Sequence, residues 1–272
     1  MQMTAKSSVD SVRREMISRM LVPLPPTREE QDRIAAALSD ADALIESLEQ
    51  LIAKKRAIKQ GAMQELLTGK RRLPGFKGEW RKATLSQACR TIVDGTHFTP
   101  RYVQSGVPFY SVENVTADDF INTKYISLEE HQSLIKRCKP ERGDILLTRI
   151  GAIGDTKLLD WDVNASIYVS LALLKCASDV DSAYLYAYSK SGRFRKEIED
   201  RSLLNATPRK INMGDIGQVP IELPELQEQE AIAHAALEME AEFSGLMRKL
   251  AKARQVKQGM KQELLTGRVR LV

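Results

Sequence analysis

Polar residues in the middle of the chain occupy turns between short apolar runs, where their side chains could contact DNA. Arginine and asparagine are shaped for paired hydrogen bonds with guanine and adenine, whereas serine, threonine and lysine suit phosphates. Any one such residue alone is more often a solvated loop residue, so only the set favours nucleic-acid binding. The set comprises Asp94, Thr96, His97, Thr99, Arg101, Ser111, Glu113, Asn114, Thr148, Arg149, Asn205, Thr207, Arg209 and Lys210.

Sequence motifs for catalysis are not found. The chain has no GxxxxGK[ST] for phosphates, no GxSxG and no Asn-Pro-Pro-aromatic segment of the kind that amino-methyltransferases use. GAIG at 151–154 lacks the glycine spacing of a dinucleotide site. His97, His131 and His234 show neither metal-ligand spacing nor a nearby acid, which favours structural roles. We therefore expect no catalytic residue, no metal site and no cofactor.

The composition is typical of a soluble, folded protein of one or two domains. Of 272 residues, 43% are apolar and 28% are charged. No segment is apolar and long enough for a membrane span or a signal peptide, so we expect a cytoplasmic protein. The net charge of +5 indicates an anionic partner only weakly. Cys89, Cys138 and Cys176 lie far apart in the sequence, so we expect neither a disulfide framework nor a metal or redox pair.

One segment of the chain occurs twice. KQGAMQELLTGKRRL at 59–73 returns as KQGMKQELLTGRVRL at 257–271, with an offset of 198 residues and 11 of 15 positions identical. The match extends upstream without a gap to Pro26 and Pro224. Upstream of that point the offset becomes 199, and the matched positions mostly share only their apolar character. This offset pairs Val12, Ile17, Val22, Leu24 and Pro25 with Ile211, Ile216, Ile221, Leu223 and Pro224.

Each copy predicts a helix of about 40 residues, roughly 60 Å long. Thr27 and Glu30 have capping-box spacing, and Gly69 provides a stop after ELLT. Apolar residues recur in alternating steps of four and three, which is the pattern of a coiled-coil seam. The seam positions are Ile34, Leu38, Ala41, Ile45, Leu48 and Ile52 in one copy, and Ile232, Ala236, Met239, Phe243, Leu246 and Leu250 in the other. We expect the copies to pair as an antiparallel coiled coil.

The identities concentrate in the KQGxxQELLTG ends rather than in the seam. If the two helices only packed against each other as an ordinary helical hairpin, the identities would be expected in the seam first. Polar residues kept at fixed spacing instead suggest a surface that touches the same kind of partner twice. The predicted docking residues are Lys59, Gln60, Gln64, Glu65, Lys257, Gln258, Gln262 and Glu263.

The segment between the two copies changes to short apolar runs separated by turns. These runs are TIVDG at 91–95, GVPFYSVENV at 106–115, GDILLTRIG at 143–151 and ASIYVSLALLKC at 165–176, and helical spacing returns at 182–201. The pattern predicts an α+β globule of about 150 residues with its own core.

Taken in order, these motifs resemble the specificity (S, HsdS) subunits of type I restriction-modification systems. The resemblance covers nearly the whole chain. It rests on LPPTREEQDRIA at 24–35, the two KQGxxQELLTG copies, DGTHFTP at 94–100, GVPFYSVENV, GDILLTRIG, and RKINMGDIGQVPIELP at 209–224. In that family each globular target-recognition domain reads one half of a bipartite DNA site. The repeated helices set the separation of the domains and dock two methyltransferase subunits.

The resemblance implies a half-size or truncated form with a single recognition domain. Residues 1–25 would be a remnant of a preceding domain, with 7–25 as its closing strand, followed by a long helix in 26–73. Residues 74–223 would form a mixed α/β recognition domain, and 224–272 a second long helix. The candidate DNA contacts are Thr96, His97, Thr99, Arg101, Ser111, Asn114, Thr148, Arg149, Arg209 and Lys210, with Arg149 expected at a rim.

Several partners follow from the resemblance. They are double-stranded DNA, methyltransferase (M) subunits and restriction (R) subunits. Because one recognition domain is missing, we also expect a homodimer or pairing with a separately encoded S half-subunit. The alternative is a non-catalytic coiled-coil interaction module that binds protein and no DNA. Salt-dependent binding to duplex DNA would separate the two readings.

Overall fold

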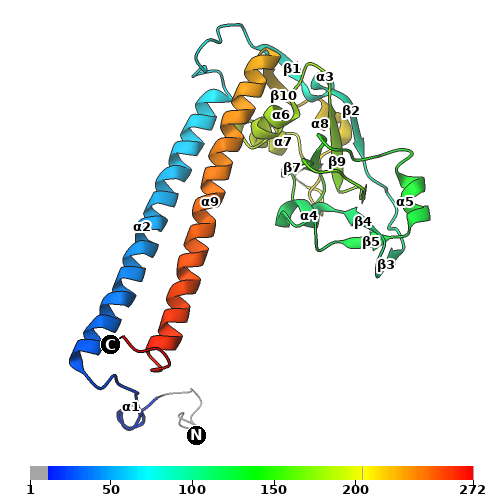
Figure 1. Cartoon of the computed structure of the whole chain (residues 1–272). Coiled ribbons are helices and arrows are strands. Elements are labelled where there is room, and N and C mark those ends of the chain that lie inside the picture. Colours follow the sequence, from blue (N-terminus) through cyan, green and yellow to red (C-terminus); the bar gives the residue numbers. More distant parts are fainter. Residues whose placement is uncertain (1–11, 204, 272) are drawn as a thin grey trace. The chain divides into compact units, whose positions relative to one another are not determined.

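The computed structural model describes residues 12–203 and 205–271, and it divides into two compact units (Figure 1). The first unit comprises the described parts of Met1–Ala57 and Ala241–Val272, and the second comprises Ile58–Glu240. Two long helices dominate, α2 (Arg28–Leu66) and α9 (Leu226–Leu264). In the described part of the chain, no helix is long and apolar enough to cross a membrane.

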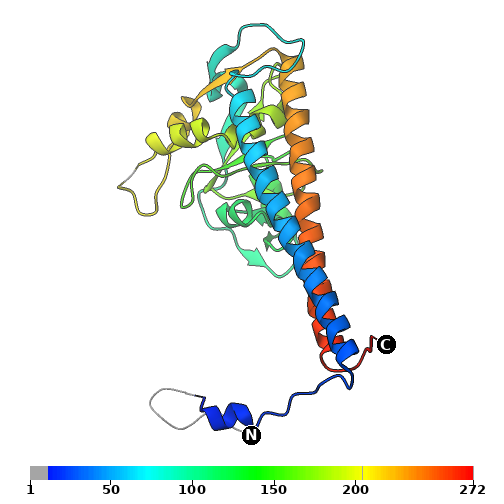
Figure 2. The same ribbon diagram turned by 90° about the vertical axis from the view of Figure 1, so that its left-hand side faces the viewer.

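Within the first unit, the two long helices lie side by side and run antiparallel (Figures 1 and 2). Lys55 binds Glu242 at 2.6 Å and Arg254 binds Glu49 at 2.6 Å, while Lys257 binds Asp42, so residue numbers rise on one helix as they fall on the other. The seam positions face inward, and Ile52 and Leu250 are both buried. The predicted antiparallel pairing and its seam are therefore confirmed.

The repeat builds the same helix ends twice. The hydroxyl of Thr27 accepts a hydrogen bond from the backbone N–H of Glu30 at 3.2 Å, which confirms the Thr27 half of the predicted capping box, while the carboxylate of Glu30 binds Arg270. Gly69 and Gly267 both have positive φ, of 67° and 71°, where a side chain would be strained. Gly69 thus ends α2 as the sequence predicted, and its counterpart Gly267 follows α9 in the same conformation.

Two equivalent ion pairs join the start of each helix to the segment that follows the other helix. Arg72 donates to both carboxylate oxygens of Glu228, at 2.5 and 2.6 Å. Arg270 and Glu30, each 198 residues away from its counterpart, repeat this geometry at 2.5 and 2.7 Å. Glu228 has no exposed surface, and the indole N–H of Trp80 also donates to it at 3.2 Å. Each copy thus supplies the arginine that neutralises the other copy's glutamate.

Three β-sheets lie in the second unit, between the long helices in sequence. The strands are β1 (Arg81–Thr84), β2 (Cys89–Asp94), β3 (Tyr102–Val103), β4 (Val107–Tyr110), β5 (Lys124–Ile126), β6 (Ile145–Thr148), β7 (Thr156–Leu158), β8 (Ser166–Ile167), β9 (Leu171–Cys176) and β10 (Pro220–Leu223). Their orders are β2-β9-β6-β7, β3-β5-β4-β8 and β1-β10. All pairs are antiparallel except β4 with β8.

Short helices connect and cover the sheets. They are α3 (Leu85–Ala88), α4 (Val112–Ala117), α5 (Leu128–Leu134), α6 (Ser182–Ser189), α7 (Gly192–Asp200) and α8 (Met213–Gly217). Strand β9 is buried on both faces, because Ala172 and Leu174 pack with the core around Tyr184 whereas Leu171 and Leu173 pack with the core around Tyr110. The mixed α/β domain flanked by two long helices is the fold that the sequence predicted.

Residues 12–25 differ from the expected closing strand. They contain one short helix, α1 (Arg14–Ser18), and no strand; residues 7–11 lie outside the described residues. At an offset of 199 residues, α1 corresponds to α8, and 21–24 corresponds to β10. Strand β10 exists because it pairs with β1, whereas 21–24 has no such partner among the described residues. Unpaired backbone cannot form a sheet, which is why the strand prediction is wrong.

Residues 12–25 expose apolar side chains whose counterparts, 199 residues later, are buried. Five apolar residues that are buried near the end of the second unit have exposed counterparts here. Leu21, next to them, is 99% exposed. The exposed residues are Val12, Ile17, Met20, Val22 and Leu24, and the buried ones are Ile211, Ile216, Val219, Ile221 and Leu223.

The fold brings two of the three cysteines together. Cys89 and Cys176 lie far apart in the sequence but are direct partners in the register of β2 and β9. Both thiols are free, and Cys138 is buried in the other core. The antiparallel pairing of β2 with β9 brings together two residues that are far apart in the sequence.

Candidate nucleic-acid interface

One edge of the sheet β2-β9-β6-β7 gathers most of the predicted DNA-contacting residues. Because the strands are antiparallel, β2 and β6 end at the edge where β7 and β9 begin, so the register places Asp94 and Thr148 beside Ala172 and Leu171. The segments that leave this edge are 95–101, 149–155 and 168–170. They carry Thr96, His97, Thr99, Arg101 and Arg149.

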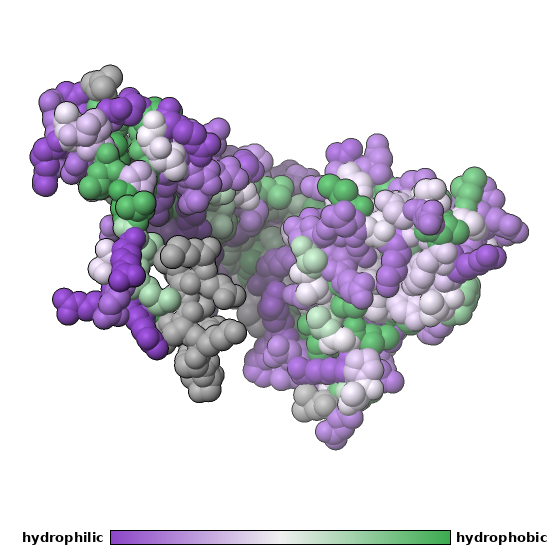
Figure 3. All heavy atoms as spheres, turned by 90° about the horizontal axis from the view of Figure 1, so that it is seen from below, coloured by the Kyte–Doolittle hydropathy of each residue, from purple (hydrophilic) through white to green (hydrophobic). Residues whose placement is uncertain are grey.

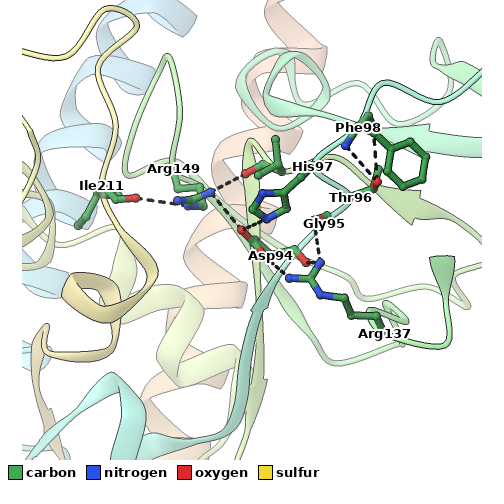
Figure 4. Close-up of polar contacts among 9 residues, drawn as sticks. Asp94, Gly95, Thr96, His97, Phe98, Arg137, Arg149 and Ile211 are labelled. Carbon is green, nitrogen blue, oxygen red and sulfur yellow. Dashed lines mark hydrogen bonds and ion pairs between the residues drawn. The ribbon is translucent and has the colours of Figure 1, made fainter.

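A buried carboxylate, Asp94, organises this edge (Figure 4). It is 5% exposed and accepts hydrogen bonds from three cationic or polar side chains. Arg137 donates at 2.5 Å, the ring of His97 lies at 2.9 Å, and Arg149 donates at 3.3 Å. Arg137 also donates to the carbonyl oxygens of Asp94 and Gly95, both at 2.9 Å. Asp94 therefore fixes side chains from three separate segments.

Arg149 is the cross-link between the loops of this edge. Its side chain donates to the carbonyl oxygens of Val169 at 3.0 Å and Ile211 at 3.3 Å, in addition to Asp94. Its backbone is bonded to Ser170 and Ile211. The residue is only 8% exposed, so the expected position at a rim is wrong. Burial follows because the guanidinium neutralises the buried Asp94 and satisfies two loop carbonyls.

The electrostatics support charged forms of both groups. Burial by itself would raise the pKa of Asp94, but hydrogen bonds and charge from Arg137 and His97 outweigh it and hold that pKa below its usual value. Burial lowers the pKa of Arg149, and the charge of Asp94 opposes this effect. An arginine remains protonated near neutral pH even when its pKa is lowered. The centre of the candidate interface is therefore the ion pair of Asp94 and Arg149, with Arg137 as a further cation beside it.

His97 has an acidic neighbour that the sequence analysis overlooked. Its ring contacts Asp94, three residues earlier, while 65% of its side chain remains exposed. His234 likewise lies 3.5 Å from Glu238, one helical turn away. The statement that no acid lies near a histidine is thus wrong for both. In the described part of the chain, no cluster of three or more His, Cys, Asp or Glu residues could hold a metal ion.

Four of the ten candidate residues are buried and have structural hydrogen bonds. Asn114 accepts from the backbone of Ser111 at 2.9 Å and donates to the carbonyl of Asp119 at 2.9 Å, which closes the start of α4. Thr148 bonds the backbone of Asp155 on both sides of a turn. Thr96 and Arg149 complete the buried group.

The exposed candidates are His97, Thr99, Arg101 and Lys210, with Ser111 and Arg209 half-buried. Arg209 donates to Ser202 at 3.1 Å, and Thr99 lies 3.4 Å from the hydroxyl of Tyr168. Among the described residues, the side chains of Arg101 and Lys210 have no hydrogen-bond or ion-pair partner. These two cations are available to an anionic ligand.

The sequence analysis missed two residues at this edge. Arg137 comes from the segment after α5, and only the fold brings it to Asp94. Phe98, next to His97, is an exposed aromatic side chain. A local signal existed for Phe98, an aromatic residue within the turn sequence DGTHFTP, but none existed for Arg137.

Comparison with known proteins agrees with this architecture. Residues 80–245 match the family model described as "Type I restriction modification DNA specificity domain". The chain belongs to this family. The match covers the sheets, the short helices and the first half of α9.

Members and structural neighbours of the specificity-domain family extend the likeness beyond this segment. The type I restriction enzyme MjaVIII specificity subunit of Methanocaldococcus jannaschii is 25% identical over 285 residues, covering 98% of this chain and 66% of that protein. The crystal structure of the S subunit from M. genitalium superposes with a TM-score of 0.64 at 15% identity, over 96% of this chain and 67% of that one.

A second solved structure gives the same result. The HsdS subunit from Thermoanaerobacter tengcongensis has a TM-score of 0.55 at 22% identity, over 97% of this chain and 65% of that one. The chain thus spans about two thirds of the length of the relatives it matches. At these identities the solved structures establish the fold.

We predict that Asp94→Asn destabilises the second unit by about 3 kcal/mol, because it leaves the buried guanidinium of Arg149 without a counter-ion. Urea unfolding at pH 7 measures the change. The lowered pKa of Asp94 means that its contribution is present above its unfolded pKa and is lost as pH falls through the folded pKa. Below that pH the two proteins should converge in stability. The control His97→Gln, at an exposed ring, should stay close to the wild type; an equal loss in both variants would contradict the central role of Asp94.

Proposed function

We propose that this chain is a DNA-specificity subunit whose recognition domain reads one half of a bipartite DNA site. The observation that carries the proposal is the match to the specificity-domain family over the unit that gathers partnerless cations at one sheet edge. The face of the protein seen in Figure 3 is mostly hydrophilic, with smaller hydrophobic patches. A polar, cation-bearing edge suits a phosphate backbone better than an apolar partner.

The geometry divides the ten candidate residues between two roles. Exposed His97, Thr99, Arg101 and Lys210 are proposed to touch DNA, with Ser111 and Arg209 beside them. The buried members are proposed to position the loops that carry these contacts. Arg149 is the main positioning residue, because it joins Asp94 to two loop carbonyls. Phe98 and Arg137 are added to the proposed DNA-facing surface.

The chain is proposed to have no catalytic role of its own and to give specificity to M and R subunits. The KQGxxQELLTG ends remain the proposed docking surfaces. Gln60, Gln64, Glu65, Gln258 and Gln262 are exposed there, and Glu263 is half-buried. Lys59 and Lys257 form ion pairs with Glu240 and Asp42, so they also hold the helices together.

A groove on the first unit adds to this docking surface. It measures about 800 Å³ and is lined by Leu44, Leu48 and Val256, with Arg248, Lys249 and Lys252 at its sides. Leu44, Leu51 and Ile58 are exposed at seven-residue spacing on α2. Such a stripe fits the apolar face of a further helix, and acidic residues on that helix would match the cations.

The functional unit is proposed to contain two recognition domains. Residues 12–24 carry the apolar pattern of the α8–β10 segment but lack the strand that β10 pairs with. A second copy of the chain in a two-fold dimer would supply the second domain, and symmetry would then give identical half-sites. Helices of 39 residues, about 58 Å long, can separate two domains by roughly one turn of DNA. A separately encoded S half-subunit is the other way to complete the unit.

The DNA-binding proposal is tested with a target selected from random duplexes. We predict that Arg101→Ala combined with Lys210→Ala weakens binding at least tenfold and reduces the slope of log K against log salt by about 2, if both cations contact phosphates. The matched control Lys82→Ala removes an exposed cation on β1 and should leave both the affinity and the slope unchanged, because this lysine lies away from the candidate edge. Absence of salt-dependent duplex binding by the wild type would instead favour the interaction-module alternative.

Docking is tested with purified methyltransferase subunits. We predict that Glu65→Lys with Glu263→Lys weakens association by at least tenfold, because charge is reversed on both repeated surfaces. The fold should persist, since the ion pairs of these residues with Arg71 and Arg268 are exposed and contribute little. Glu79→Lys with Glu129→Lys makes the same charge change at exposed sites outside the repeated ends. Equal affinity in both double variants would contradict the assignment.

Association of the chain with itself is tested by light scattering. We predict a mass of two chains at micromolar concentration, and we predict that Val22→Asp with Leu24→Asp returns the protein to one chain. Leu128→Asp, at an exposed leucine of α5, is the control and should remain dimeric. A wild-type monomer would refute the homodimer, and dimerisation only with a different half-subunit would support the split version.

A further inference from the structure

Cys89 and Cys176 face each other across strands β2 and β9. They are register partners, and the backbone N–H of Ala177 donates to the carbonyl of Ala88 at 2.9 Å. A hydrogen bond between the residues that flank a pair identifies the closely spaced type of antiparallel pair, in which Cα atoms lie about 4.5 Å apart in a regular ladder. This spacing lies within the range of about 4.4–6.8 Å that disulfides span. The register shifts by one residue directly after this pair, between Cys89 and Thr91.

The two side chains also point to the same side of the sheet. Cys89 belongs to the core around Tyr184, and Cys176 packs against that core. The neighbouring thiol of Cys176 and burial together raise the pKa of Cys89 above its usual value. Register and shared packing therefore bring the two thiols to the same place in the reduced protein.

Solvent reaches this pair through Cys176. Cys89 is buried, whereas Cys176 is half-buried and lines a cavity of about 370 Å³. Arg90 and Arg142 also line the cavity, together with the carboxylates Asp144, Asp181 and Glu230, of which Asp144 is neutralised by Lys175 at 2.6 Å. This polar, mixed-charge cavity gives a small polar reagent access to the more accessible thiol.

We propose that Cys89 and Cys176 form a redox-sensitive dithiol that a small polar disulfide, such as oxidised glutathione, converts into a cross-strand disulfide. The thiolate of Cys176 attacks one sulfur of the reagent, and one thiolate leaves. The thiolate of Cys89 then attacks Sγ of Cys176, and the second thiol of the reagent leaves. The protein loses two protons and two electrons, and the reagent gains them.

The position of the pair determines what oxidation does. Cys89 begins β2, and Asp94 ends the same strand at the candidate DNA-binding edge. A bond at the far end of the strand closes a chain loop of nearly 90 residues without touching Asp94 or its partners. Oxidation is therefore expected to stabilise the second unit and to leave the binding edge unchanged.

The test incubates the full chain with oxidised glutathione at pH 8.5 and follows it by mass spectrometry and thermal unfolding. We expect the loss of two hydrogen atoms, a peptide linking Cys89 to Cys176, and a midpoint of unfolding raised by about 5–10 °C. Dithiothreitol should reverse all three changes. The rate should rise with pH above 8.5, because attack by Cys89 requires its thiolate.

Three variants make the result specific. Cys138→Ala removes the buried thiol of the other core and should oxidise like the wild type. Cys89→Ala should stop at a glutathione adduct on Cys176, with no cross-link and no gain in stability. Cys176→Ala should not react. Because Cys176 is half-exposed, this variant should stay folded, so it tests the proposal even if Cys89→Ala unfolds. A stable glutathione adduct on the wild type, or a cross-link that includes Cys138, would overturn the proposal.

Discussion

Antiparallel pairing of two long helices with narrow apolar seams is the constraint on which the rest of the structure depends. A single helix of this kind cannot bury its stripe alone. Antiparallel alignment places the start of one helix near the end of the other, so the arginine after each end reaches the glutamate at the other's start. Arg72 with Glu228 and Arg270 with Glu30 are two versions of this contact. A parallel alignment would bring the two glutamates toward the same end, so the ion pairs select one direction.

The candidate interface depends on a second buried charge. Asp94 would be costly to bury alone, and Arg149, Arg137 and His97 compensate that cost from three separate segments. Arg137 and Arg149 also donate hydrogen bonds to backbone carbonyls at the same edge, and His97 lies on one of its loops. Fixing one carboxylate therefore fixes several loops, while the cations beyond it remain exposed. The proposed function thus assigns positioning and contact to different side chains, which is how a rigid sheet can present an adaptable surface.

Periodic and local features, and the helix pairing that the repeat implies, could be predicted from the sequence, whereas the pairings between strands could not. The repeat, the seam, the cap at Thr27 and the stop at Gly69 each depend on residues within a few positions or on an exact offset. The contact of Arg137 with Asp94 and that of Cys89 with Cys176 arise from sheet order, for which the sequence holds no local signal. Arg149 was placed at a rim because its neighbours look like a turn; its burial follows from a carboxylate 55 residues away. The strand expected near residue 22 failed because a strand needs a partner.

The separation of buried and exposed polar residues has a consequence for how new binding preferences could arise. Replacing Arg101 or Lys210 breaks no hydrogen bond or ion pair within the described chain, so such changes should alter stability by less than about 0.5 kcal/mol. Replacing Asp94 or Arg149 leaves a buried charge without its counter-ion and lowers the stability several times more. Mutation can therefore explore the outer residues almost freely while the inner pair holds the loops in place. With the outer residues contacting DNA as proposed, the ligand preference of the fold can drift without loss of its structure.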